Sequence, residues 1–220
     1  ENEEKYAVQL FGSSPEIMAK AAIIIVENYA PSCIDVNAGC PMPKITKSGA
    51  GSALLSNPKL LFDILTALVD TLSPYKIPVT LKIRSGKTCD APLWKEASKV
   101  AVEAGVKAIT MHPRSQAQCY SGVSNTQLIG ELKEEVGKYG VKIFGSGDLF
   151  SPEDAKKMFE VTKCDGIMFA RGAMGNPFIF RQTIEFLKTG KITEISVEDK
   201  IKTAKKELFL LCKAKGEKLG

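Results

Sequence analysis

The residue in this sequence that is best suited to chemistry is Cys40. It stands in the loop Asn37-Ala38-Gly39-Cys40-Pro41-Met42-Pro43-Lys44, directly after the short apolar segment Cys33–Val36. Glycine and proline mark a turn, and the carboxyl end of a strand is where α/β barrels place their reactive groups. A cysteine is more often a buried structural residue, and that is our interpretation of Cys33, Cys89, Cys119, Cys164 and Cys212. For Cys40 we predict a functional role.

Polar side chains close almost every segment that has strand character. They are Gln9, Asn37, Lys82, Arg84, His112, Arg114, Ser146, Asp148 and Arg171. Lys82 and Arg84 alternate with apolar residues, so both side chains point to the same face of one strand. Two cations at a buried strand end are costly unless an anionic or polar ligand compensates them. We therefore interpret Lys82 as a cofactor contact and Arg84 as a substrate contact.

The single histidine, His112, ends a predicted strand in Thr110-Met111-His112-Pro113-Arg114. A lone histidine is often only a structural residue, but the polar neighbours at this strand end favour a role in function. A mononuclear metal site is not expected, because the sequence has no second histidine and its cysteines do not have the spacing of metal ligands.

Two glycine-bearing turns follow the last two predicted strands. Their sequences are Gly145-Ser146-Gly147-Asp148 and Ala170-Arg171-Gly172-Ala173-Met174-Gly175. Backbone N–H groups in such turns can approach a phosphate closely, and barrels often bind phosphate after their last two strands. Arg171 would add charge-assisted hydrogen bonds. Together the two turns predict a phosphate-bearing ligand.

The segments that must position these residues alternate between β-branched runs and helical patterns. The predicted strands are Tyr6–Phe11, Ile34–Val36, Val79–Ile83, Ala108–Met111, Val141–Phe144 and Gly166–Ala170. Strand–helix units in series predict a parallel sheet with right-handed crossovers. An open doubly wound sheet and a (β/α)8 TIM barrel both fit this pattern. Polar residues at almost every strand end favour the barrel, because an open sheet concentrates its site at one switch point.

A complete barrel of this class has eight strands, so we expect the chain to hold strands 3–8 and to lack the first two βα units. Residues 1–190 would then form the barrel domain, and residues 191–220 would begin a helical region, with a helix over Val197–Gly220. Four further helix starts are predicted where a capping side chain precedes a proline, at Ser14-Pro15, Asn57-Pro58, Ser151-Pro152 and Asn176-Pro177.

The composition is that of a soluble globular protein, with 220 residues of which 44% are hydrophobic and 25% are charged. No apolar run reaches the roughly 20 residues that span a bilayer, so no membrane association is expected. Six cysteines without regular spacing predict reduced thiols and a cytoplasmic protein. The net charge of +5 suits a nucleic-acid partner without demonstrating one. We expect a monomer.

Several segments, taken in order, resemble the tRNA-dihydrouridine synthases, which are flavin-dependent (β/α)8 barrels. The resemblance extends from about Ala7 to Leu187. Its segments are Val8–Gly12, Asp35–Pro41 with Lys44, Gly49–Leu55, Val79–Arg84, His112–Arg114, then Gln118, Tyr120 and Gly122, and finally Gly145–Asp148 and Ala170–Pro177. The loop Asn37-Ala38-Gly39-Cys40-Pro41 with Gly49-Ala50-Gly51 downstream is the most specific of these matches.

The resemblance implies an enzyme that reduces the uracil 5,6 double bond in tRNA with FMN, which NADPH has reduced. It implies that Gln9, Lys82 and His112 contact the flavin ring, and that the flavin phosphate is held by Ser146, Gly147, Asp148, Ala170 and Arg171. It also implies a substrate side made of Asn37, Lys44, Arg84 and Arg114. Cys40 would be the general acid that protonates carbon 5 of the uracil.

Two alternatives remain open from the sequence. One is an FMN-dependent barrel reductase that acts on a free pyrimidine, which would need no basic surface for RNA. The other is a non-catalytic barrel retained as an RNA-binding module, which would not bind flavin. The sequence does not give the tRNA position that would be modified.

Overall fold

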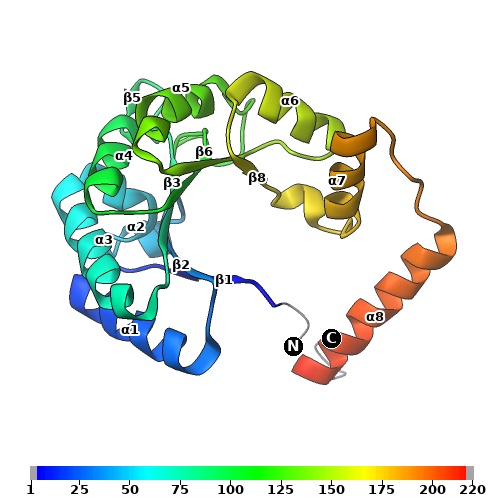
Figure 1. The fold of residues 1–220 in the computed structure, drawn as a ribbon, viewed down its shortest axis with the longest axis horizontal. Helices are drawn as coiled ribbons and strands as arrows, with labels where there is room; N and C mark the ends of the chain where they lie inside the picture. Colours follow the sequence, from blue (N-terminus) through cyan, green and yellow to red (C-terminus); the bar gives the residue numbers. More distant parts are fainter. Residues whose placement is uncertain (1–3, 217–220) are drawn as a thin grey trace.

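A computed structural model describes residues 4–216 of the chain. Its centre is a six-stranded parallel sheet with the order β1-β2-β3-β6-β7-β8, in which neighbours along the chain are also neighbours in space. The strands are β1 (Ala7–Leu10), β2 (Cys33–Ala38), β3 (Val79–Arg84), β6 (Ala108–His112), β7 (Lys142–Ser146) and β8 (Gly166–Met168). The sheet curls into a half-barrel in which β1 and β8 are the two edges (Figure 1). All six strands were predicted, as was their parallel arrangement.

Helices cover the convex outer face of this half-barrel (Figure 1). They are α1 (Pro15–Tyr29), α3 (Pro58–Leu72), α4 (Trp94–Glu103), α5 (Gln127–Val136), α6 (Pro152–Thr162) and α7 (Ile179–Thr189). Shorter elements complete the connections, namely α2 (Pro43–Thr46), the hairpin strands β4 (Gly86–Thr88) and β5 (Ala91–Pro92), and the 3-10 helices η1 (Gly51–Ser56), η2 (Ser73–Tyr75), η3 (Gly137–Tyr139) and η4 (Arg171–Ala173).

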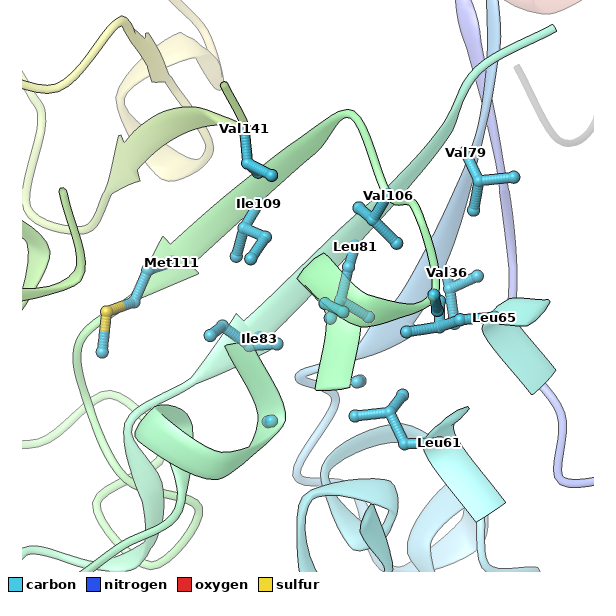
Figure 2. Packing of buried hydrophobic residues seen from close by; sticks show 14 of the residues in the cluster. Val36, Leu61, Leu65, Val79, Leu81, Ile83, Val106, Ile109, Met111 and Val141 are labelled. Carbon is cyan, nitrogen blue, oxygen red and sulfur yellow. The ribbon is translucent and has the colours of Figure 1, made fainter. Parts of the chain in front are cut away.

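The core lies between the sheet and these helices, because every second strand residue points outward and is apolar. Val79, Leu81 and Ile83 of β3 are at most 2% exposed. They pack in one cluster with Leu61 and Leu65 of α3, as Figure 2 shows. The residues between them on each strand point to the concave face, so polar side chains at these positions do not enter the hydrophobic core.

Three of the four predicted helix starts are confirmed. Ser14, Asn57 and Ser151 each accept a hydrogen bond from a backbone N–H of the first helical turn. The prediction at Asn176 is wrong, because α7 begins only at Ile179 and has Phe178 at its cap position. The backbone of Asn176 is instead used in two successive turns, with its N–H donating to Ala173 and its carbonyl accepting from Ile179.

The last helix, α8 (Val197–Lys215), stands apart from the half-barrel at the end of an extended connection (Figure 1). It has no buried residue among those the structure describes, and several large apolar side chains on it are exposed. The helix predicted over Val197–Gly220 is therefore confirmed as far as Lys215, and residues 217–220 lie outside the described part. Within residues 4–216, no helix is both long and apolar enough to cross a membrane.

The cysteines are less uniform than predicted. Only Cys164 is buried among the five that we interpreted as structural, while Cys33, Cys119 and Cys212 are half-buried and Cys89 is exposed. Cys89 lies in the turn between β4 and β5, on a hairpin outside the six-stranded sheet.

Candidate active site

A single cavity of about 500 Å³ opens at the carboxyl ends of the six strands. It is lined by most of the residues predicted to be functional, which are Gln9, Asn37, Cys40, Lys82, Arg84, His112, Ser146, Gly147, Asp148, Ala170 and Arg171. The remaining lining includes Gly39, Pro41, Met42, Tyr120, Leu149, Phe150, Met168 and Gly172. Residues scattered over more than 160 positions of sequence therefore meet in one place, because parallel strands end on the same side of the sheet.

The loop that carries Cys40 is fixed by the side chain of Asn37. The Oδ1 atom of Asn37 accepts hydrogen bonds from the backbone N–H groups of Gly39 at 3.0 Å and of Cys40 at 2.9 Å. The Asn37 Nδ2 group donates to Gln9 Oε1 at 2.8 Å. These contacts hold the free, half-buried thiol of Cys40 at the cavity wall.

The neighbouring Gly51 explains why glycine follows this loop in the sequence. Its φ is +62°, and a Cβ at this position would lie 2.8 Å from the carbonyl oxygen of Cys40. A side chain would therefore push the Cys40 loop away from the 3-10 helix η1. With glycine at this position, η1 lies against the Cys40 loop, and the Ser52 N–H donates to the Cys40 carbonyl at 3.0 Å.

Two cations approach the cavity from β3. Arg84 is buried and donates three hydrogen bonds to backbone carbonyls, to Gly39 at 2.8 Å, Ser115 at 3.0 Å and Cys119 at 2.8 Å. It thereby ties the Cys40 loop to the loop after β6. Burial lowers the pKa of the Lys82 ammonium, and the nearby charge of Arg84 lowers it further. A polar or anionic ligand in the cavity would relieve this strain between charges.

The histidine at the end of β6 is neutral at physiological pH. Burial is the main cause that lowers the pKa of His112 to about 3, and the charges of Arg84, Lys82 and Arg114 add to it. The Nε2 atom of His112 lies 3.5 Å from Nη1 of Arg114. Because the guanidinium can only donate, Nε2 is the unprotonated ring nitrogen in this contact and the proton is on Nδ1.

The predicted phosphate turns meet at the far side of the cavity. Gly147 adopts a φ of +111°, and a Cβ there would lie 2.5 Å from Ser124 Oγ and 2.8 Å from the ring of His112. Arg171 lies with its guanidinium 4.8 Å from the centre of the Tyr120 ring and 5.4 Å from that of Phe150. The guanidinium also contacts Asp148 Oδ1 at 3.2 Å.

Two predicted substrate residues do not line the cavity. Arg114 is buried and forms a two-point ion pair with Asp148, with both N···O distances at 2.8 Å. It also donates to the backbone carbonyls of Ser121 and Gly122. Lys44 lies on the exposed helix α2 beside the cavity. Their roles as substrate contacts remain predictions.

Asp148 is a partner for cations in this structure. Burial acts to raise its pKa, but hydrogen bonds from Arg114 and the Ser124 N–H, together with the charges of Arg114 and Arg171, outweigh that effect and lower it. The Asp148 carboxylate is therefore ionised and positions both guanidinium groups. Any contact of residue 148 with a phosphate would use its backbone N–H.

Sequence reasoning assigned no role to several residues that shape the site. Tyr120 and Phe150 lie on loops whose course cannot be read from periodicity. Asp35 lies on β2 and could have been found, because it alternates with Asn37 and must share its inward face. Within the described residues, no group of three or more histidine, cysteine or acidic side chains is placed to hold a metal ion.

Comparison with known proteins places this geometry in context. The family model described as Dihydrouridine synthase (Dus) matches residues 1–220. A probable tRNA-dihydrouridine synthase of Treponema pallidum is 51% identical over 219 residues, which are 98% of this chain and 64% of that protein. One of Aquifex aeolicus is 35% identical over 96% of this chain and 64% of its own length. The tRNA-dihydrouridine synthase B of Shewanella oneidensis is 36% identical over 97% of the chain and 65% of its own length.

The chain thus spans about two thirds, 64%, of the length of the first two relatives. Among solved structures, DHODH of Eimeria tenella in complex with ferulenol has a TM-score of 0.56 at 13% identity, covering 81% of this chain and 55% of that one. A mandelate racemase/muconate lactonizing protein of Paracoccus denitrificans also has a TM-score of 0.56, at 10% identity, covering 85% of this chain and 45% of that one. At these identities the likeness concerns the fold alone.

Proposed function

The chain belongs to the dihydrouridine synthase family, and on this basis we propose that its protein is a flavin-dependent tRNA-dihydrouridine synthase. The reaction is reduction of the 5,6 double bond of specific uridines in tRNA. The observation that carries the proposal is the meeting of the Cys40 thiol, the Lys82 and Arg84 cations and two glycine-bearing turns in one cavity. A proton donor together with groups able to bind a phosphate in the same cavity suits a flavin-dependent ring reduction.

The residues present fit FMN. The turns at Ser146–Asp148 and Ala170–Arg171 border the cavity, where their backbone N–H groups can approach a phosphate. The lack of a side chain at Gly147 lets the first turn lie against Ser124 and His112. Arg171 adds a positive charge at the same end. Gln9, Lys82 and His112 would contact the ring system of the flavin. When bound and reduced by NADPH, the flavin supplies the hydride.

The protein's own residues supply the proton and the surroundings. Cys40 donates its thiol proton to carbon 5 of the uracil and becomes a thiolate, which solvent then protonates again. Asn37 fixes the loop from which the thiol reaches the ring. Neutral His112 can donate a hydrogen bond from Nδ1 without adding a further charge beside Lys82.

On the substrate side, Asn37 and Arg84 border the cavity and would contact the uridine, with Lys44 at its rim. Arg114 would act there through the loop that it holds. The net charge of +5 favours an RNA partner. We propose that residues 1–190 form the catalytic domain, and that residues 191–220 begin a helical region for tRNA. The exposed apolar side chains of α8 support a further packing partner for that helix.

The test uses the complete gene product and tRNA from a strain that lacks the gene. We expect the protein to purify with bound flavin and to form dihydrouridine in that tRNA when NADPH is added without oxygen. Free uracil and orotate serve as control substrates. Reduction of a free pyrimidine but not of tRNA would reject the proposal in favour of a small-molecule reductase, and a protein without flavin would favour an RNA-binding module.

A further inference from the structure

A buried carboxylate lies directly behind the residues that hold Cys40. Asp35 is 7% exposed, and β-sheet register places it between Gln9 of β1 and Thr80 of β3. Its Oδ2 accepts a hydrogen bond from Gln9 Nε2 at 2.6 Å, and its Oδ1 accepts one from the Thr80 hydroxyl at 2.6 Å. Asp35 does not line the cavity, so any influence on the reaction must pass through other residues.

The hydrogen bonds run in one direction from Asp35 to Cys40. A carboxylate oxygen can only accept, so Gln9 must turn its NH2 group toward Asp35 and its carbonyl oxygen away. That oxygen accepts from Asn37 Nδ2 at 2.8 Å. The Asn37 oxygen is thereby directed to the N–H groups of Gly39 and Cys40. If the side-chain amide of Gln9 or of Asn37 were flipped, two donors or two acceptors would face each other.

The direction does not depend on whether Asp35 is ionised. Burial raises the pKa of Asp35 above its ordinary value, because it outweighs the hydrogen bonds from Gln9 and Thr80 and the charge of Lys82, which act to lower it. A hydroxyl can donate or accept. If Asp35 were protonated, the proton would therefore lie on Oδ1, which would donate a hydrogen bond to the Thr80 hydroxyl oxygen. Oδ2 would still accept from Gln9 in either state.

We propose that Asp35 is a positioning residue which, through Gln9 and Asn37, fixes the orientation of two amide groups and so holds the Cys40 loop. The effect of Asp35 on the position of the thiol does not depend on the proposed function. Its effect on the reaction rests on the proposed function, in which Cys40 delivers a proton.

The reactivity of Cys40 toward a small alkylating reagent measures this positioning in protein from which any bound flavin has been removed, and without tRNA. In the complete gene product, peptide mapping gives the alkylation rate of Cys40 relative to that of the exposed Cys89, which serves as an internal reference. Asp35→Leu removes the acceptor at similar size. We expect the relative rate of Cys40 to rise about fivefold, as it would if about 1 kcal/mol of loop restraint were lost.

Two variants separate the acceptor role from other effects. Asp35→Asn keeps an oxygen that accepts from Gln9, while its NH2 group donates to the Thr80 hydroxyl oxygen. The alkylation rate of Cys40 should therefore stay within about twofold of wild type. Thr80→Val removes the other hydrogen bond of Asp35 and should also leave the rate within about twofold. If Asp35→Asn loosens Cys40 as much as Asp35→Leu does, the charge and not the acceptor matters, and the proposal is wrong.

Replacement of Gln9, the next residue in the series of hydrogen bonds, provides an independent test. This test also serves if Asp35→Leu does not fold. Gln9 lines the cavity on the concave face of the sheet, so its replacement leaves the core between the sheet and the helices intact. Gln9→Leu should raise the alkylation rate of Cys40 by the same factor as Asp35→Leu. The double variant should raise it no further, because both changes interrupt the same series of hydrogen bonds. An unchanged rate in Gln9→Leu, or effects that multiply in the double variant, would overturn the proposal.

The same variants connect the positioning to catalysis. In the proposed enzyme, Asp35→Leu should lower kcat for dihydrouridine formation while the KM for tRNA stays close to wild type, and Asp35→Asn should restore kcat. A wild-type protein that forms no dihydrouridine would reject the proposed function but leave the alkylation result intact. A loosened Cys40 with unchanged kcat would reject the catalytic part alone.

Discussion

Replacing Cys40 with alanine should separate the two halves of the proposed reaction. Reduction of the flavin by NADPH needs no acid from the protein, whereas reduction of uracil needs a proton at carbon 5. Loss of a general acid typically costs about 10²- to 10⁴-fold in rate. Cys40→Ala should therefore oxidise NADPH at close to the wild-type rate while dihydrouridine formation falls by at least about 100-fold.

The structure limits what the same change does to stability. Cys40 is half-buried on a loop, and alanine keeps the backbone contacts with Asn37 and Arg84. The loss of one partly buried sulfur should cost less than about 1 kcal/mol. Cys33→Ala is the matched control, because Cys33 is also half-buried but lies at the opposite end of β2. It should retain dihydrouridine formation.

The assay follows flavin re-oxidation by tRNA without oxygen, together with analysis of dihydrouridine in the same tRNA. Thermal unfolding of both cysteine variants excludes a difference in folding. Dihydrouridine formation by Cys40→Ala at close to the wild-type rate would refute the role of Cys40 as general acid. A parallel fall in NADPH oxidation would also refute it, since the thiol would then serve the flavin.

Three further predictions concern the cavity's charged and titrating groups. Arg171→Ala should weaken FMN binding by roughly 10- to 100-fold, because it removes a charged hydrogen bond worth about 1.5–3 kcal/mol. Equilibrium titration that found unchanged FMN affinity together with weaker tRNA binding would contradict this. Arg114→Leu should lower the free energy of unfolding by about 3 kcal/mol, because it leaves Asp148 without its buried partner, whereas Arg171→Leu at the more exposed pair should cost less than about 1 kcal/mol in the same urea titration. His112 lowers stability in acid, since the unfolded chain gains a proton below its ordinary pKa of 6.5 while the folded chain, with a pKa of about 3, does not. Between pH 7 and pH 5 this should amount to about 2 kcal/mol, and His112→Asn should show a drop in unfolding free energy that is smaller by that amount.

The sequence predicted the elements well because their signals are local. Alternation of apolar and polar residues marked each strand, and serine or asparagine before proline marked three helix starts that the structure confirms. The failure at Asn176 has a local cause as well. Its backbone forms two turns that no single-residue preference describes. Which polar residues face the cavity was also largely predictable, since the carboxyl ends of parallel strands converge.

The pairing between loops was not predictable, and it decides what several residues do. Arg84 ends β3 and Arg114 lies two residues beyond the end of β6, yet Arg84 borders the cavity and Arg114 does not. The difference arises because the loop after β7 brings Asp148 against Arg114 and encloses it. Only the three-dimensional course of both loops contains that information.

More cations than carboxylates border the cavity. Lys82, Arg84 and Arg171 border the cavity, with Arg114 behind them, and Asp35 and Asp148 are the carboxylates packed among these groups. Asp148 contacts two of the guanidinium groups, while Asp35 accepts from the Gln9 amide and acts to raise the pKa of Lys82 less than burial and Arg84 lower it. An excess of positive charge is therefore left at the cavity and is not neutralised by the protein. That excess favours a ligand with an anionic group, such as a flavin phosphate or the backbone of an RNA, and disfavours a neutral free base.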